Sequence, residues 1–418
     1  MRFAHISDCH LGAWQHNEKL SELNLQAFLT AMDICLERQV DFVLIAGDLF
    51  NTPNPDLAVV EIAVRKMKLL KDTGIQFYMI LGSHDYSPNV KSISDVLSSA
   101  GFIATVMNYE EKNGRLLLNF VRDPKTGALL AGLSGKRKGE DAEDFPRLDI
   151  RHIQKEKGFK IFAFHNYLSG IAPSEIPGIP SLPLESLPRG FDYYAGGHPH
   201  KKQQHDSPNY GHVVHAGTLF GCRPVDLKIS ATGERKGFYI VTAENNNVTD
   251  IEFCEVRVCE VVSPPTMDIE GMDVSSARAK IRQHIAGMEV DEKVVLLEIK
   301  GRLSEGKPYQ IHFQELEDEL MKKGARTVLL DRRGVVGQAL EGASTDKEVS
   351  QVEADELEEA LRDFDSSLPA LKGGDGLTLA QEFLQTLSAK REENQTKKAY
   401  EESMIKLGQD IIIRRLVQ

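Results

Sequence analysis

Six short apolar runs recur in the first half of the chain and constrain its fold more than any other feature. They read RFAHIS, DFVLIAGD, QFYMILGS, KIFAFHNY, FDYYAGGH and VVHAGTLF. Their short length and their β-branched and aromatic residues are typical of buried strands. Between the first three runs, apolar residues recur at helical spacing, at Leu23, Ala27, Ala31, Ile34 and Cys35 and again at Val60, Ala63, Met67 and Leu70. This alternation predicts a layered α/β domain over residues 1–245.

The remaining chain divides into three further segments. Residues 246–335 alternate the strand-like runs FCEVRVCEV, KVVLLEIKG and RTVLLDRR with two helix-like stretches, which predicts a small α/β domain. Residues 336–375 are acidic with few bulky side chains, which indicates a mobile linker that could contain a short helix. Residues 376–418 carry two apolar stripes, and we expect two amphipathic helices that pack back on the protein or dock on a partner helix.

Composition narrows the class of protein. The 418 residues carry a net charge of −12, which argues against a generic nucleic-acid coat protein. It does not exclude nucleic acid as a substrate, because metal ions, local basic patches or a partner chain could supply positive potential. Two such patches are the run KRK at residues 136–138, which could equally be a solvated loop, and the pair Lys201 and Lys202.

Cysteine usage and hydropathy indicate the compartment. The five cysteines are scattered and form no CxxC pair, so a disulfide framework and a zinc knuckle are both poorly supported. The opening MRFAHISDCHLG lacks a long apolar stretch, and no apolar run approaches the roughly 20 residues that span a bilayer. We therefore expect a cytoplasmic protein without membrane contact.

Polar, titratable residues stand where five of the predicted strands end. They are Asp8 and His10, then Asp48, then Ser83, His84 and Asp85, then His165, and finally His198 and His200. Ligand sites in α/β sheets gather at the carboxyl ends of strands, so these side chains are expected to converge. Asp8 and His10 are two residues apart, as are His198 and His200, and such residues point to one side of an extended chain. Cys9 would then point away from the cluster.

Carboxylates together with neutral imidazoles suit Mn²⁺, Fe or Zn²⁺ better than Ca²⁺ or Mg²⁺ alone. The candidates are too many for one tetrahedral ion, but enough for two ions about 3.5–4 Å apart that share a carboxylate. Such a centre attracts phosphate and activates water, so the sequence predicts hydrolysis of a phosphoester. Taken singly, each histidine is more often structural, and we keep that interpretation for the histidines outside these motifs, such as His5 and His215.

The ordered motifs SDCHLG, AGDLF, LGSHD, FHNY and GGHPH resemble those of the calcineurin-like metallophosphoesterases. The longer stretches FAHISDCHLG, VDFVLIAGDLFN and HAGTLFGCRP are similar to the nuclease subunit of SbcD-type DNA double-strand-break repair complexes. The motifs cover about residues 1–225, and the order of the later segments extends a weaker resemblance. The resemblance implies a metallophosphoesterase β-sandwich flanked by helices (1–245), a capping domain (246–335), a linker (336–375) and a helical partner-binding segment (376–418).

The resemblance also implies roles for the residues at the strand ends. Asp8, His10, Asp48 and His200 match the ligands of one metal, and Asp48, His165 and His198 match those of the other, with Asp48 bridging. His84 matches the histidine that protonates the leaving oxygen or stabilises the transition state, with Asp85 as its support. Where the family places a metal-binding asparagine this chain has Ser83, whose shorter hydroxyl would bind the second metal more weakly or through water.

The implied activity is that of a Mn²⁺-dependent nuclease with 3′–5′ exonuclease action on duplex ends and endonuclease action on single strands. Each subunit would hold two Mn²⁺ ions, with Mg²⁺ or another divalent ion as the alternative. An SMC-like coiled-coil ATPase would bind the C-terminal helices, within a heterotetramer containing a homodimer of this chain, associated with the nucleoid. Lys201 and Lys202 would contact DNA phosphates.

Two other functions are compatible with the sequence. The same metals could cleave a small or lipid phosphodiester, although the small domain and the terminal helices disfavour this. Alternatively, the chain could be a DNA-end scaffold whose nuclease has decayed at Ser83, although the remaining seven matched residues are intact.

Overall fold

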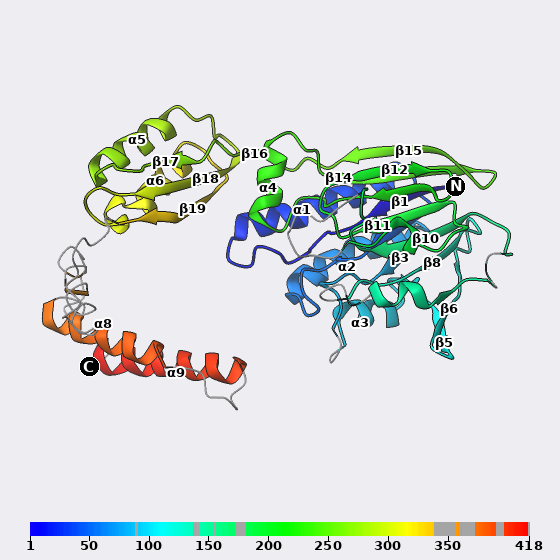
Figure 1. Cartoon of the computed structure of the whole chain (residues 1–418), viewed down its shortest axis with the longest axis horizontal. Coiled ribbons are helices and arrows are strands. Elements are labelled where there is room, and N and C mark those ends of the chain that lie inside the picture. Colours follow the sequence, from blue (N-terminus) through cyan, green and yellow to red (C-terminus); the bar gives the residue numbers. More distant parts are fainter. Residues whose placement is uncertain are drawn as a thin grey trace. The chain divides into compact units, whose positions relative to one another are not determined.

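The computed structural model describes residues 1–87, 91–136, 140, 142–151, 153, 155–171, 181–337, 357–358, 361, 373–389 and 397–416. The chain divides into two compact units, Met1–Gln338 and Ala339–Gln418 (Figure 1). The predicted linker at 336–375 lies mostly outside the described residues. Among the described helices, none combines the length and the apolar character needed to cross a bilayer.

Two six-stranded sheets form the larger part of the first unit. The first sheet has the order β15 (Asn247–Glu255), β14 (Gly237–Glu244), β1 (Arg2–Ile6), β2 (Phe42–Ala46), β3 (Gln76–Ile80) and β4 (Ala104–Thr105). The second has the order β12 (Gln203–Ser207), β13 (Gly211–His215), β11 (Tyr193–Gly197), β10 (Lys160–His165), β8 (Leu129–Gly132) and β7 (Val121–Arg122). In the first sheet β1 to β4 are parallel, whereas β14 and β15 pair antiparallel at one edge. In the second sheet the four inner strands are parallel and both outer pairs are antiparallel.

Each of the six strands predicted in the first half of the chain is present, which confirms the α/β class. The sixth run, VVHAGTLF, is a strand only up to His215, where β13 ends. The two sheets pack face to face around one apolar cluster, in which the ring of Phe3 stacks on Phe42 at 5.1 Å and meets Tyr193 edge-on at 5.4 Å. Burying a side chain of this size contributes about 1.5–3 kcal/mol, so the cluster holds the two sheets firmly together.

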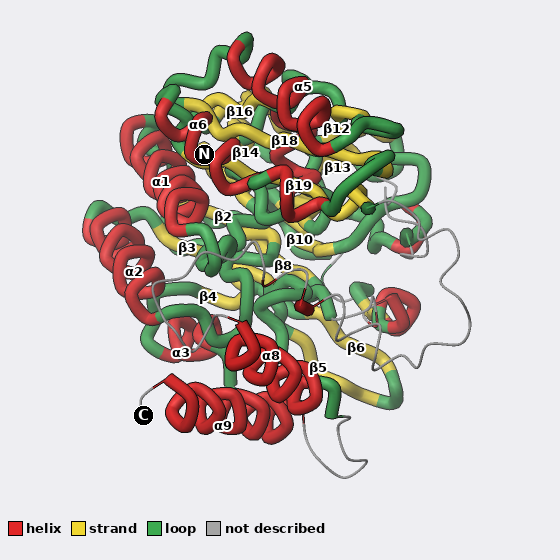
Figure 2. Tube along the Cα trace, turned by 90° about the vertical axis from the view of Figure 1, so that its left-hand side faces the viewer, coloured by secondary structure: helices red, strands yellow, loops and turns green. Residues whose placement is uncertain are grey.

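Helices cover the other face of the first sheet. They are α1 (Glu18–Glu37), α2 (Leu57–Asp72) and α3 (Ile93–Ser99), and Figure 2 shows them along one side of β2 and β3. The residues predicted at helical spacing are buried against this sheet, except Ile34, which is half-buried. A further small sheet contains β5 (Tyr109–Lys112), β6 (Arg115–Leu118) and β9 (Leu148–Asp149).

The first sheet extends past residue 245, where we predicted the domain to end. Asn245 and Asn246 both have positive φ (51° and 61°) and form the two-residue turn of a hairpin, so residues 247–255 pair with β14 as β15. The run FCEVRVCEV is therefore not one strand. Its first part lies in β15, and its last part in β16 (Glu260–Val262) of another sheet.

The small domain contains a four-stranded sheet of β16, β18 (Lys293–Arg302), β17 (Met267–Asp268) and β19 (Thr327–Val336). Helices α5 (Val274–Ala286) and α6 (Phe313–Lys322) pack on it around an apolar core of their own. Helix α4 (Pro224–Ala231) contacts β16 and β18. The second unit contains α8 (Gly373–Leu387) and α9 (Lys397–Leu416), which pack against each other, with Leu379 and Ile411 buried.

Candidate metal centre

The carboxyl ends of the parallel strands in both sheets meet at one end of the sandwich. Asp8, His10, Asp48 and His84 follow strands of the first sheet, whereas His165, His198 and His200 end or follow strands of the second. The ring Nδ1 of His165 lies 2.8 Å from the carbonyl oxygen of Ala46, and the backbone N–H of His198 donates to both carboxylate oxygens of Asp8 at 3.0 and 3.2 Å. The predicted convergence is thus present, and it joins two sheets rather than one.

The backbone at these residues is not extended, contrary to our prediction. Asp8, His10, Asp48 and His198 have φ values of 50°, 46°, 53° and 90°. Left-handed conformations of this kind are uncommon outside glycine and cluster at functional sites. They are held here by backbone hydrogen bonds between neighbouring strand ends, Asp8 N–H to Gly47 O and His10 N–H to Asp48 O, both 3.0 Å long. Cys9 points into the apolar core as expected, but because of this turn rather than by strand alternation.

A first group of ligand-type atoms surrounds Nε2 of His10. This atom lies 3.2 Å from Nε2 of His200, 3.7 Å from Asp48 Oδ2 and 3.9 Å from Asp8 Oδ1. Ligands bound to one ion at about 2.0–2.2 Å lie roughly 3–3.5 Å apart, so small movements would close this group around a metal. A divalent ion would also satisfy the two imidazole nitrogens of His10 and His200, which face each other.

A second group of ligand-type atoms, from His165 and His198, also includes the carboxylate of Asp48. The ring Nε2 of His165 lies 3.2 Å from Asp48 Oδ2 and 4.0 Å from Asp8 Oδ1, and a ring nitrogen of His198 lies within 4.8 Å of both Asp48 and His165. His165 Nε2 is buried and has no hydrogen-bond partner of suitable geometry. A buried nitrogen aimed at a carboxylate without a hydrogen bond is well placed to bind a metal.

The electrostatics of the two groups favour a cation. Burial would lower the pKa of His165, but the carboxylates of Asp48 and Asp8 raise it to about 10. Burial likewise would raise the pKa of Asp48, yet His165 and its neighbours bring it well below its usual value. Burial lowers the pKa of His198 to about 3 and that of His10 well below its usual value, so both rings are neutral and can offer a lone pair.

His84 lies at the exposed side of the centre. Its backbone N–H donates to Asp48 Oδ1 at 2.8 Å, and its ring packs edge-on against that of His10 at 4.7 Å between centroids. Ring Nδ1 lies 2.9 Å from the carbonyl oxygen of Asn51, a partner that the sequence did not suggest. Donation from Nδ1–H to this oxygen orients the ring and leaves Nε2 to make other contacts.

Asp85 is fully buried beneath His84. Its carboxylate accepts from the backbone N–H groups of Leu49, Phe50 and Gly82 at 3.2, 3.0 and 3.0 Å, and so ties the turn after β2 to the turn after β3. Burial and the nearby Asp48 raise the pKa of Asp85 to about 7. Ser83, half-buried, lies in the same turn.

The two lysines that we predicted to contact DNA differ in their surroundings. Lys201 is exposed. Lys202 pairs with Glu234 at 2.9 Å, and its ammonium lies 4.8 Å from the ring centre of Phe253. Lys202 is thus already engaged in the fold. His5 and His215 are buried and bonded to Tyr193 and to the carbonyl oxygen of Asn166, and burial lowers the pKa of both, so they fit the structural interpretation.

Three residues around His200 were missed by the sequence analysis. Asp226 lies 3.0 Å from ring Nδ1 of His200, Arg223 packs beside both, and the ammonium of Lys236 donates to the carbonyl oxygen of His200 at 2.9 Å. The run CRPVD, with proline at the first position of α4 and an aspartate in its first turn, is a helix-start signal that could have indicated Asp226.

The chain is similar to a known enzyme family and to several named proteins. Residues 1–202 match the calcineurin-like phosphoesterase family. A protein from Methanopyrus kandleri named DNA double-strand break repair protein Mre11 is 26% identical over 62% of this chain and 57% of its own length. One of the same name from Sulfolobus acidocaldarius is 22% identical over 87% of this chain and 98% of its own. The SbcD component of the nuclease SbcCD from Escherichia coli is 26% identical over 68% of this chain and 74% of its own.

Against the Methanopyrus protein and several archaeal relatives like it, the chain spans only about half of the relative's length.

Proposed function

We propose that residues 1–202, which match the calcineurin-like phosphoesterase family, form the catalytic part of a manganese-dependent DNA nuclease. The observation that carries the proposal is the position of Asp48. Its Oδ2 atom lies 3.7 Å from His10 and 3.2 Å from His165, so one carboxylate serves two groups of imidazoles. This is the arrangement that a pair of metal ions sharing a carboxylate requires.

We assign one ion to Asp8, His10, Asp48 and His200, and the other to Asp48, His165 and His198. Two Mn²⁺ ions per subunit fit this mixture of carboxylates and neutral imidazoles, with Mg²⁺ or another divalent ion as the alternative. Bound there, the ions would lower the pKa of water and neutralise charge on the phosphoryl oxygens. Ser83 contributes a weak ligand to the second ion, directly or through water.

His84 acts as the proton donor. The contact of its Nδ1 with Asn51 O and that of its backbone N–H with Asp48 hold the ring beside the proposed metal centre. In its imidazolium form the ring carries a second proton at Nε2, and this proton passes to the leaving oxygen as the P–O bond breaks, which leaves a neutral ring with its Nδ1–H on Asn51. Asp85 keeps the turn that carries His84 in place through its three backbone contacts.

DNA is the proposed substrate because relatives that cover most of this chain are named as a DNA break-repair protein and a nuclease subunit. The activity would include 3′–5′ exonuclease action on duplex ends and endonuclease action on single strands, with Lys201 near the DNA backbone. A small or lipid phosphodiester is the competing substrate. Digestion of end-labelled duplex and single-stranded DNA, beside hydrolysis of bis-p-nitrophenyl phosphate, separates the two, and cleavage of the small ester alone would contradict a DNA nuclease.

The substitution His84→Ala tests the catalytic assignment. We expect DNA cleavage to fall by about 100-fold or more, the usual contribution of a proton-transferring group, while Mn²⁺ binding measured by calorimetry stays unchanged. His205→Ala, at an exposed histidine on β12, is the matched control and should cleave normally. Undiminished cleavage by His84→Ala would show that His84 is not the proton donor, whereas a wild-type chain that binds Mn²⁺ without cleaving any phosphodiester would favour a scaffold protein.

We further propose that the C-terminal segment 376–418 binds an SMC-like coiled-coil ATPase. On α9, Ile405, Leu407, Ile412 and Ile413 are exposed apolar residues, which suits docking of a partner helix. Helices α2 and α3 also expose apolar residues, among them Ile62, Leu69 and Val96, and these could support a homodimer within a heterotetramer. Such a complex would act in the cytoplasm at the nucleoid.

A further inference from the structure

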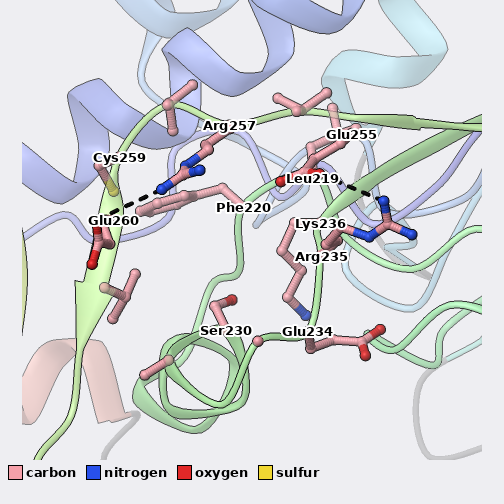
Figure 3. A pocket seen from close by; sticks show the side chains of 15 residues that line it. Leu219, Phe220, Ser230, Glu234, Arg235, Lys236, Glu255, Arg257, Cys259 and Glu260 are labelled. Atoms are coloured by element: carbon pink, nitrogen blue, oxygen red, sulfur yellow. Dashed lines mark ion pairs between the residues drawn. The ribbon is translucent and has the colours of Figure 1, made fainter.

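His200 is held on two sides by Lys236 and Asp226, which none of the sequence motifs contains. The ammonium of Lys236 donates to the main-chain oxygen of His200 at 2.9 Å. Figure 3 shows this lysine reaching along the wall of a cavity of about 340 Å³, beside Ser230 and Glu234. On the ring side, Asp226 Oδ2 lies 3.0 Å from Nδ1. The backbone and the ring of His200 therefore have separate supports.

Asp226 is the better-built of these supports. It is 1% exposed and also accepts from the backbone N–H groups of Cys222 and Arg223 at 3.1 and 3.0 Å. These contacts fix its carboxylate at the first turn of α4. With backbone N–H groups on one side and the ring of His200 on the other, the carboxylate is placed to act as a hydrogen-bond acceptor.

The guanidinium of Arg223 introduces a competition at Nδ1 of His200. Its Nη2 atom lies 3.2 Å from Asp226 Oδ1, and it also lies 3.1 Å from Nδ1 itself. A neutral imidazole carries one ring proton. While Asp226 accepts Nδ1–H, the guanidinium can donate only to the carboxylate, and Nε2 keeps the lone pair that points at His10. If Nδ1 instead accepted from Arg223, the ring proton would move to Nε2 and occupy the position of the metal bond.

We propose that Asp226 is the positioning residue of His200 and selects, against Arg223, the ring tautomer that can bind metal. The inference rests on the metal centre proposed above, and it concerns how one ligand of that centre is kept competent. Many metal-binding histidines are oriented by a hydrogen-bond partner alone. Here the carboxylate also prevents the neighbouring guanidinium of Arg223 from donating to Nδ1, which would favour the tautomer that cannot bind metal. Removing the carboxylate alone should therefore lower Mn²⁺ affinity more than removing the carboxylate and the guanidinium together.

Three variants of the full chain test this, with Mn²⁺ affinity measured by calorimetry. Asp226→Ala should weaken binding at the His10–His200 group by about 10- to 100-fold, the usual effect of removing such a partner. The double variant Asp226→Ala/Arg223→Ala should bind Mn²⁺ roughly threefold to tenfold more tightly than Asp226→Ala. Asp226→Asn keeps an acceptor oxygen and should lose less than about tenfold.

Thermal unfolding in chelator controls for damage to the fold. Asp123→Ala removes another fully buried carboxylate, which accepts from Tyr78 and Thr126, and should lower stability without changing Mn²⁺ affinity. Unchanged affinity in Asp226→Ala, or a double variant as weak as the single one, would overturn the proposal. A wild-type chain that binds Mn²⁺ but cleaves no DNA would contradict the proposed substrate and leave this inference standing.

Discussion

His165 and His200 are both held at ring Nδ1, but by different kinds of acceptor. His165 ends strand β10, and its Nδ1 meets the main-chain oxygen of Ala46 at the end of β2. His200 lies beyond the end of β11, and its Nδ1 meets the side chain of Asp226. A main-chain acceptor is supplied by the pairing and packing of strands, whereas a side-chain acceptor depends on one residue and can be removed.

From this difference we infer that the proposed centre has a rigid half around His165 and an adjustable half around His200. Around His165, the strand ends approach so closely that side chains must be absent from Gly47 and Gly197, where a Cβ atom would lie 2.3 and 2.7 Å from His165 Nδ1. Around His200, a short helix and three charged side chains set the geometry. Substitutions should therefore disrupt the first half through the backbone and the second through individual contacts.

The largest effect is expected for Gly47→Ala. Its φ of +89° and the 2.3 Å approach to His165 both oppose a side chain, and we expect a loss of about 3 kcal/mol in the free energy of unfolding, together with loss of Mn²⁺ binding. Gly74→Ala is the control, since φ is +92° there but nothing lies within 4 Å of the added carbon. Urea denaturation of both variants measures the difference. Equal losses would show that the rigid half is not sterically constrained.

A smaller effect concerns the proton on His165. Because its pKa is raised to about 10, the ring is protonated at neutral pH without metal and must lose this proton to bind Mn²⁺. Apparent affinity should therefore rise about tenfold per pH unit between roughly pH 7 and 9, and calorimetry in buffers of different ionisation enthalpy should report about one proton released. The metal-free protein has the opposite trend, since the stability contributed by this proton is complete below the unfolded pKa near 6.5 and is lost toward pH 10.

His165→Gln should remove that proton release while leaving the His10–His200 group able to bind. Release that persists in this variant would assign the proton to another residue and weaken the contrast between the two halves.

The smallest effect is expected for Ser83→Asn. A longer side chain with a carbonyl oxygen should raise the affinity for the ion held by His165 and His198 by up to about tenfold. The affinity for the other ion should not change. The Mn²⁺ concentration needed for half-maximal DNA cleavage measures this. If the requirement does not change, Ser83 plays no part in holding the second ion.

The sequence was informative where chemistry follows directly from a strand. Apolar runs with polar residues at their ends predicted the strands of the core and the residues that meet at the centre. The sequence was misleading where a turn decided the backbone conformation or the end of a domain. We assumed an extended chain at Asp8 and His10, but both have positive φ, and we ended the first domain before a hairpin whose signal, Asn245–Asn246, was present in the sequence.

By itself the sequence determined which residue types stand at the strand ends, because strand formation and turn formation depend on neighbouring residues. Only the tertiary structure decided that Asp8 would accept from the backbone of His198, 190 residues away, and that Asp226 would meet His200. Such contacts arise from the packing of two sheets and the placement of one helix, and these depend on the burial of apolar surface across the whole domain rather than on any local pattern.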